Sequence, residues 1–141
     1  MKVLDTDTCV EILRGNLKVM ERRVDQTEEV VTTWMTAGEL YFGAACSRDP
    51  LGNRSLVEQF LRTLPVIGMD RRTADVFGET KAALQRAGEV LPDADVIIGA
   101  IVLARGAVIV TGNRARFERL PGIRIEDWIR PGARRRPLRS S

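Results

Sequence analysis

Apolar residues along the chain follow two different periods, and the alternation of these periods predicts the secondary structure. Short apolar or β-branched runs predict strands at 2–4, 29–36, 65–69, 107–111 and 122–128. Helical spacing between these runs predicts helices at 8–15, 16–26, 37–47, 55–64, 71–88 and 93–106. A turn is expected at 49–53. Strands that alternate with helices indicate an α/β fold, a sandwich in which helices flank a central, mainly parallel sheet.

The length and the charge distribution divide the chain into a domain and a tail. The sequence has 141 residues, enough for one domain with a single core, which we predict at 1–129. Residues 130–141 contain five arginines and no acid, so we expect a basic, disordered tail. This tail can contact RNA or an acidic partner, or it can lack a fixed role. No apolar run reaches the roughly 20 residues of a membrane span, and no signal segment opens the chain, so we expect a cytoplasmic protein.

The absence of histidine narrows the possible chemistry. The sequence contains no histidine, which excludes Ser–His and Cys–His nucleophile pairs and zinc bound by imidazole. Cys9 and Cys46 have no metal-ligand spacing, and their apolar neighbours favour two small core residues. Catalysis by this chain would therefore depend on carboxylates, hydroxyls, Lys, Arg or a hard metal ion.

Several oxygen-bearing side chains are expected at one edge of the sheet. Asp5 ends the first strand, Glu39 lies in the helix after the second, and Asp95 opens the buried helix. Thr111 and Asn113 follow the strand at 107–111. Sites in such sheets form beyond the carboxyl ends of the strands, so these side chains can share one crevice. Oxygen ligands without nitrogen or sulfur suit Mg²⁺ or Mn²⁺, which activates water for attack on a phosphate.

Each acid also has a purely structural interpretation. Asp7 and Asp93 are placed to cap helices, which we favour over metal ligation for both. Glu39 can be an exposed helix residue, although its neighbours predict tight packing, where an unpaired acid is costly. Asp95 would stabilise the positive end of its helix dipole without any metal. The three acids Asp5, Glu39 and Asp95 together favour a site.

Four blocks of the sequence contain the candidate residues: "LDTDTCVEIL" at the start, "TAGELYFGA" around Glu39, "PDADVIIGAIVLARG" around Asp95, and "VIVTGNRARFERLPGIRIEDW" near the end. These blocks resemble, in the same order, those of PIN-domain ribonucleases and, among these, the VapC-type toxins of toxin–antitoxin modules. They span residues 1 to about 129. One such block would be weak support, but four in order are specific.

The resemblance implies an endoribonuclease that binds Mg²⁺ or Mn²⁺ through Asp5 and Asp95, with Glu39 completing the acidic centre. It implies supporting roles for Thr6, Thr36, Thr111 and Asn113. Family members form homodimers, cleave structured RNA such as transfer or ribosomal RNA, and are neutralised by a cognate antitoxin that inserts a segment into the active-site groove. The resemblance therefore implies these partners for this chain as well.

One position departs from the family pattern. Many members have a fourth acid directly before the Phe of the last block, where this chain has Arg116. This change leaves open whether one metal ion or two would bind. Arg116 either contacts an RNA phosphate or is a surface arginine without a role.

Two other functions are compatible with parts of the sequence. Asp5 and Asp7 have the spacing of the two catalytic acids in haloacid-dehalogenase-like phosphatases, and Thr111 resembles their second motif. However, no Lys follows Thr111, and the only adjacent acids after it are Glu126 and Asp127 near the tail. A PIN-like module that binds RNA or protein without catalysis is the second alternative, because the fourth acid is missing.

Overall fold

Five parallel strands form one sheet in the order β3-β2-β1-β4-β5. The structure is a computed structural model that describes residues 1–130. The strands are β1 (Lys2–Leu4), β2 (Val30–Thr33), β3 (Val66–Ile67), β4 (Val108–Val110) and β5 (Arg124–Glu126). All four pairings between neighbouring strands are parallel, which confirms the predicted sheet. The first strand of the chain is therefore the central strand of the sheet.

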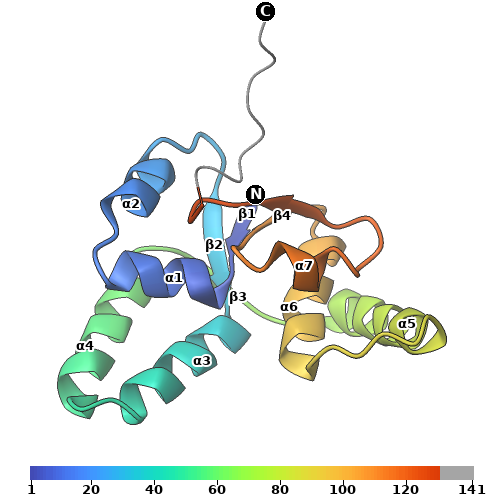
Figure 1. Ribbon diagram of the computed structural model, residues 1–141, viewed down its shortest axis with the longest axis horizontal. Helices are drawn as coiled ribbons and strands as arrows, with labels where there is room; N and C mark the ends of the chain where they lie inside the picture. Colours follow the sequence, from blue (N-terminus) through green and yellow to red (C-terminus); the bar gives the residue numbers. More distant parts are fainter. Residues whose placement is uncertain (131–141) are drawn as a thin grey trace, which may run out of the picture.

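Helices cover both faces of this sheet. They are α1 (Thr6–Leu13), α2 (Leu17–Val24), α3 (Trp34–Ala45), α4 (Pro50–Leu61), α5 (Arg71–Arg86), α6 (Asp93–Ala104) and α7 (Arg114–Phe117). In Figure 1, α1 to α4 lie on one side of the strands and α5 to α7 on the other. This division follows from the strand order, because the chain first adds strands on one side of β1 and then crosses to the other side.

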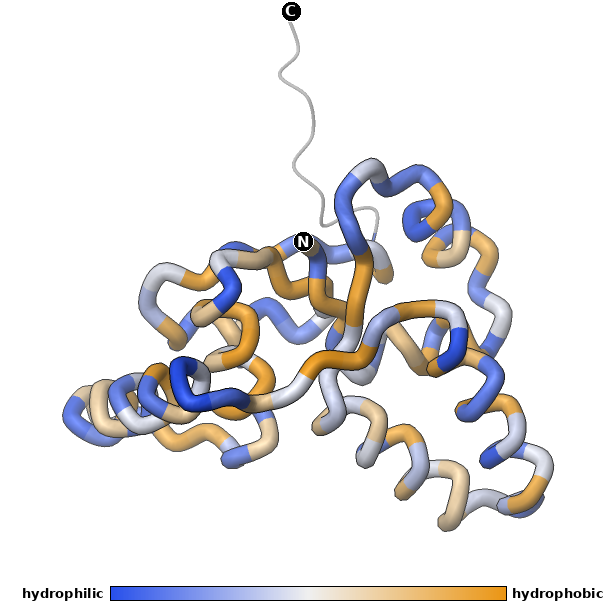
Figure 2. Tube along the Cα trace, turned by 180° about the vertical axis from the view of Figure 1, so that it is seen from behind, coloured by the Kyte–Doolittle hydropathy of each residue, from blue (hydrophilic) through white to orange (hydrophobic). Residues whose placement is uncertain are grey.

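Alternating side chains of the strands form two apolar cores. Leu4 and Val110 face the core beneath α1 to α4, whereas Val3 and Ile109 face the core that α6 and α7 cover. All four side chains are fully buried. Figure 2 shows the corresponding apolar trace along the strands and the hydrophilic segments at the outer ends of the helices. Burial on both faces explains why the interior strands read as continuous apolar runs.

Helix α6 is buried almost completely, as its apolar sequence predicted. Its buried residues include Ile98, Gly99 and Val102. A Cβ atom on Gly99 would lie 2.2 Å from Leu120 Cδ2, so only glycine lets α6 approach the segment after α7 this closely. The helix is thereby held in a fixed position with Asp95 in its first turn.

Some expectations about local structure are wrong. The turn expected at 49–53 is the start of α4: Asp49 accepts a hydrogen bond from Gly52 N at 3.1 Å, and Pro50 occupies the first helical position. The strand expected at 29–36 ends at Thr33, whose hydroxyl caps α3 by accepting from Thr36 N. Helix α7 was not expected at all.

The prediction for the cysteines can be compared with the structure, whereas that for the tail mostly cannot. Cys9 is buried as expected, but Cys46 is exposed, so the prediction of two core cysteines is wrong for Cys46. The tail predicted at 130–141 lies outside the described residues except for Arg130, whose guanidinium donates to the carbonyl oxygen of Gly112. In the described part of the chain, no helix has both the length and the apolar character that crossing a membrane requires.

Candidate active site

The pairing register of the central strands brings residues from distant parts of the chain to one edge. Leu4 of β1 pairs with Thr32 of β2 and with Val110 of β4, so these three strands end side by side. The amide of Asp5 continues this pattern by donating to Val110 O at 2.9 Å. The residues that follow the strands, Asp5 and Thr111, are therefore neighbours although 106 positions separate them.

Asp5 is a buried carboxylate held by Thr111. The Thr111 hydroxyl donates to Asp5 Oδ2 at 2.7 Å and accepts from the amide of Asn113 at 3.0 Å. Only 5% of Asp5 is exposed. Burial, followed by repulsion from the charge of Asp7, raises the pKa of Asp5 to about 6. The ionised form of Asp5 is thus unfavourable in this surrounding unless a cation offsets it.

Glu39 reaches the same edge from α3. The Thr6 hydroxyl donates to Glu39 Oε1 at 2.5 Å, and the hydroxyls of Thr6 and Thr36 lie 3.1 Å apart. Because Thr6 has a single hydroxyl hydrogen, Thr36 is the donor in this second bond. The two threonines therefore form a chain of hydrogen bonds that orients the Glu39 carboxylate. Glu39 is half-buried, between the two environments that the sequence left open.

Asp95 lies in the first turn of α6 and is 7% exposed. Arg116 Nη1 lies 3.2 Å from Asp95 Oδ2 and forms a long hydrogen bond of 3.4 Å with Oδ1. Oδ2 itself is buried and accepts no hydrogen bond from residues 1–130. Burial raises the pKa of Asp95, Arg116 opposes this shift, and Glu39 adds to it. Glu39 is thus near enough to Asp95 for its charge to disfavour the ionised form of Asp95.

Asp7 does not cap helix α1, contrary to the prediction. The residue at the cap position is Asp5, and no side chain bonds the first turn. Asp7 Oδ2 instead accepts from Gly112 N at 2.9 Å and from Asn113 Nδ2 at 3.4 Å. Asp7 therefore ties the loop after β4 to α1. The sequence analysis missed this role because the two partners are remote in the chain.

Asp93 is not a helix cap either. Pro92 precedes α6 at the cap position, and Asp93 forms an ion pair with Lys81 Nζ at 3.0 Å. This pair connects α6 to α5 at the surface. Asp93 is thus separate from the acidic centre, whereas Asp95, two residues further on, faces it.

The donor set at this edge suits a divalent cation in its chemistry. Every side chain there except Arg116 offers oxygen, three carboxylates (Asp5, Asp7 and Asp95) have raised pKa values, and the buried Oδ2 of Asp95 has only the ion pair with Arg116. Within residues 1–130, however, no three acidic or cysteine side chains lie close enough together to hold a metal as they stand. The residues therefore fit Mg²⁺ or Mn²⁺ in type and charge.

A groove beside Glu39 adjoins the acidic centre. It has a volume of about 360 Å³ and lies between α1, α3 and α4. Its lining is largely apolar and includes Val10, Leu13, Leu40, Leu56 and Val57, with Glu39 at one side. A partner segment with apolar side chains could lie in this groove and reach the acids.

Comparison with known proteins identifies the family. The chain matches the PIN domain family over residues 2–123. It is 36% identical over 127 residues to the tRNA(fMet)-specific endonuclease VapC of Salmonella typhimurium, an alignment that covers 89% of this chain and 96% of that protein. It is 30% identical over 128 residues to ribonuclease VapC2 of Haemophilus influenzae, with 90% and 97% covered. The DNA-bound VapBC structure from Salmonella typhimurium matches with a TM-score of 0.85 at 37% identity, over 90% of this chain and 97% of that chain.

The chain therefore belongs to the PIN-domain family. Within this family it is one of the VapC-type ribonuclease toxins of toxin–antitoxin modules. The resemblance of the four sequence blocks and the predicted fold class are thus confirmed. The roles of individual residues at the site remain predictions.

Proposed function

We propose that the chain is an endoribonuclease that depends on Mg²⁺ or Mn²⁺ and cuts structured RNA at the acidic centre. The observation that carries this proposal is that Asp5 and Asp95 are both buried with raised pKa values, and that each shift is caused in part by another acid of the group, Asp95 for Asp5 and Glu39 for Asp95. Three acids brought together from three segments are costly unless they serve a cation. The relatives of the chain in sequence include proteins named as ribonucleases.

Asp5 and Asp95 would hold the metal ion, and Glu39 would complete the acidic centre. The bound ion would supply an activated water and neutralise charge on the phosphate. Thr111 holds the Asp5 carboxylate in place, while Thr6 and Thr36 orient Glu39. These hydroxyls keep the acids in position before substrate arrives. The backbone amide of Asn113 donates to the Thr111 hydroxyl, and the Asn113 side chain would support hydration of the metal.

Arg116 stands where the resemblance led us to expect a fourth acid. Its guanidinium already lies beside Asp95, at the border of the acidic centre. A positive group there supports a single metal ion rather than two, because it offsets part of the negative charge that a second ion would need. We assign Arg116 a contact with an RNA phosphate, since guanidinium groups match phosphate geometry.

The partners follow from the relatives and from the groove. One relative is named for cleavage of tRNA(fMet), so we propose transfer RNA as the first substrate class to examine, with ribosomal RNA second. Solved relatives are VapBC complexes, and we propose that a cognate antitoxin inserts a segment into the apolar groove beside Glu39. We further propose that the toxin acts in the cytoplasm as a homodimer.

The alternatives receive less support. A haloacid-dehalogenase-like phosphatase would need Asp7 free as its acid, but the Asp7 carboxylate is committed to Gly112 N and Asn113. A binding module without catalysis would have no reason to keep three acids at a shared edge at the cost of their burial. The acidic centre is therefore better explained by catalysis.

Cleavage of RNA by the purified protein tests the proposal. Bulk transfer RNA is incubated with the chain in Mg²⁺, in Mn²⁺ and in EDTA, and the ends of the products are sequenced. We expect cleavage with metal only, and loss of it in Asp5→Asn. The matched control is Asp75→Asn, a surface acid on α5. Equal cleavage by Asp5→Asn and wild type would show that the site is wrong.

A further inference from the structure

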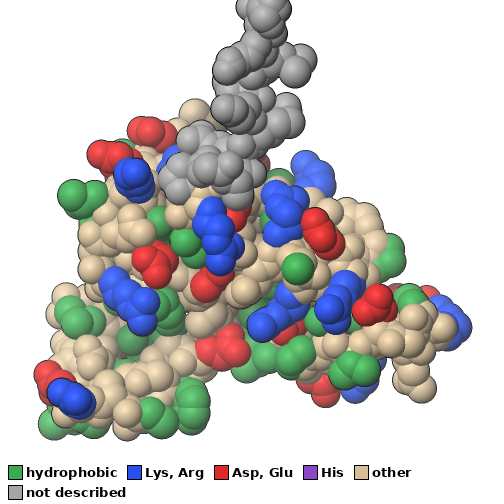
Figure 3. All heavy atoms as spheres, in the orientation of Figure 1, with side chains coloured by type: hydrophobic (Ala, Val, Ile, Leu, Met, Phe, Trp, Pro, Cys, Tyr) green, Lys and Arg blue, Asp and Glu red, His purple; other side chains and the backbone are tan. Residues whose placement is uncertain are grey.

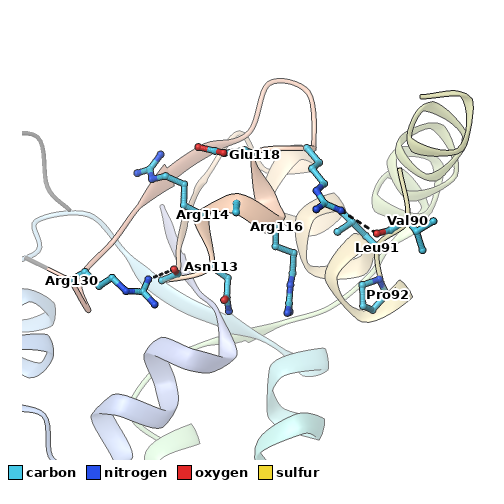
Figure 4. A pocket seen from close by; sticks show the side chains of 11 residues that line it. Val90, Leu91, Pro92, Asn113, Arg114, Arg116, Glu118 and Arg130 are labelled. Atoms are coloured by element: carbon cyan, nitrogen blue, oxygen red, sulfur yellow. Dashed lines mark hydrogen bonds between the residues drawn. The ribbon is translucent and has the colours of Figure 1, made fainter. Parts of the chain in front are cut away.

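A second cavity lies on the other side of the acidic centre, around helix α7. Its volume is about 670 Å³, and four arginines line it: Arg114, Arg116, Arg119 and Arg130. Glu118 is the one acidic residue among the described residues of its lining. We call this cavity the arginine pocket (Figure 4). In the orientation of Figure 1, Lys and Arg side chains surround the position of α7 on the visible face (Figure 3).

The arginines of this pocket differ in how many hydrogen bonds and ion pairs they form with other residues of the protein. Arg119 bonds Val90 O at 3.3 Å and pairs with Glu89 at 3.6 Å, and Arg130 pairs with Asp127 at 3.8 Å. The guanidinium of Arg114 has no such partner within residues 1–130. Each guanidinium has five N–H donors, so even the paired ones keep donors for a ligand. The pocket therefore presents an excess of positive charge and of free donors.

Two residues connect the arginine pocket with the acidic centre. Arg116 lines the pocket and lies 3.2 Å from Asp95 Oδ2. Asn113 also lines it and donates to Asp7 Oδ2 at 3.4 Å. A chain molecule bound in the pocket would therefore lie beside Arg116 and its ion-pair partner Asp95.

Part of the pocket lining is apolar. Val90, Leu91 and Pro92 form this part, in the segment that leads into α6. Figure 4 shows these three residues beside α6, across from the side chain of Arg116. Arg119 lies on the same side as this segment, because it donates to Val90 O. A pocket that combines cationic groups with an apolar segment suits a nucleotide, with phosphate on the arginines and base or ribose on the apolar side.

We propose that the arginine pocket binds the RNA backbone next to the phosphodiester that is cleaved, with phosphate contacts to Arg114 and Arg119, so that the RNA crosses α7. The inference rests on the proposed ribonuclease function and adds a binding subsite to it. An acidic peptide would also be attracted by four arginines. RNA is favoured because Arg116 of the pocket is paired with Asp95 of the acidic centre and because part of the pocket lining is apolar.

Binding is measured separately from cleavage, so that the two proposals can fail independently. The full chain with Asp5→Asn is mixed with fluorescein-labelled bulk transfer RNA in EDTA, and anisotropy gives the dissociation constant at several salt concentrations. Into this background we introduce Arg114→Gln with Arg119→Gln. The matched control is Arg62→Gln, an exposed arginine that follows α4 on the opposite side of the sheet from α7 (Figure 1). Thermal unfolding verifies that each variant is folded.

We expect the double variant to bind RNA about tenfold or more weakly. The slope of log Kd against the logarithm of the salt concentration should decrease by roughly one to two, as for the loss of phosphate contacts. Arg62→Gln should change neither quantity, and Arg114→Lys with Arg119→Lys should restore most of the affinity. An affinity of the double variant equal to that of the control would overturn the proposal. The same holds if the double variant loses binding of polyglutamate but keeps its affinity for RNA, because the pocket would then be a peptide site.

Discussion

The guanidinium of Arg116 lies 3.2 Å from the carboxylate of Asp95, so the chain places its own cation beside a predicted metal ligand. Asp95 comes from the first turn of α6 and Arg116 from α7, and both elements lie on the same side of the sheet (Figure 1). Arg116 is 47% exposed at its side chain, whereas the Asp95 side chain is 9% exposed. The arginine can therefore swing toward solvent or toward an RNA phosphate, and Asp95 cannot.

This ion pair predicts that Arg116 competes with metal in the absence of RNA. Removing its charge by Arg116→Gln should increase the affinity for Mn²⁺ several-fold, because a nearby positive charge repels a divalent ion. Calorimetric titration of Mn²⁺ into the RNA-free protein measures this. Arg114→Gln is the control, since Arg114 lies on the same helix but is not paired with Asp95. Unchanged or weaker Mn²⁺ binding in Arg116→Gln would contradict the competition.

Asp5→Asn should stabilise the metal-free protein at neutral pH. Burial and the charge of Asp7 raise the pKa of Asp5 to about 6. The native state thus favours the protonated carboxyl. The stability that protonated Asp5 contributes is fully present below the ordinary pKa of an aspartate and is lost as pH rises through about 6. The amide has no such loss, so its advantage should reach on the order of 2 kcal/mol at pH 8 and vanish near pH 4.

Urea unfolding in EDTA at both pH values measures this difference. Asp75→Asn on the surface of α5 should show no comparable dependence on pH. If Asp5→Asn is less stable than wild type at pH 8, then the ionised Asp5 carboxylate does not destabilise the metal-free protein.

Glu126 should show the opposite pH dependence. It accepts hydrogen bonds from Lys2 Nζ at 3.0 Å and from Trp128 Nε1 at 2.5 Å, and it pairs with Arg22 at 3.5 Å. Burial raises the pKa of Glu126, but these partners outweigh it and the net pKa is lowered. Its contribution is therefore present above the ordinary pKa of a glutamate and is lost as pH falls through the lowered value.

The variant Glu126→Gln should accordingly lose about 1 to 3 kcal/mol of unfolding free energy at pH 7, the range for a hydrogen bond to a charged group. The loss should shrink in acid, where the wild type also loses the charge. Chemical unfolding between pH 3 and pH 7 measures both. A loss that stays the same at every pH would show that packing, and not charge, explains the effect.

Two glycines in helices should respond differently to alanine. A Cβ atom on Gly99 would lie 2.2 Å from Leu120 Cδ2, and Leu120 is 1% exposed, so Gly99→Ala should cost about 1 to 3 kcal/mol. Gly78 on α5 has no atom within 4 Å of such a Cβ, so Gly78→Ala should be neutral or stabilise by up to about 1 kcal/mol. Thermal unfolding of both variants provides the comparison. A similar effect of the two substitutions would rule out the close approach at Leu120.

Elements with strong periodic patterns could be predicted, and elements defined by single residues could not. The apolar run at 107–111 and the apolar helix before it were placed correctly, because burial on all sides leaves no polar position in the sequence. The turn expected at 49–53 was wrong, since Asp49 and Pro50 are typical both of turns and of helix starts. Helix α7 was too short to produce a period.

Some features of the site could likewise be predicted from the sequence, and others could not. The three acids could be singled out as candidates in the sequence because each lies in a block that resembles the family, and Asp5 also ends a strand. The contacts of Asp7 with Gly112 and Asn113 could not be predicted, because they join segments more than 100 positions apart. The arginine pocket has a visible signal in "NRARFER", but the sequence does not say which of its arginines face one cavity.

The sequence by itself determined the fold class and the family and supplied the acids as candidates, because these depend on local period and on residue type at fixed places in each block. Only the tertiary structure decided which side chains are partners. It assigned Asp5 to Thr111, Asp7 to Gly112 and Asp95 to Arg116. The physical reason is the strand register, since the parallel pairing of β1 with β4 makes neighbours of residues from opposite ends of the chain.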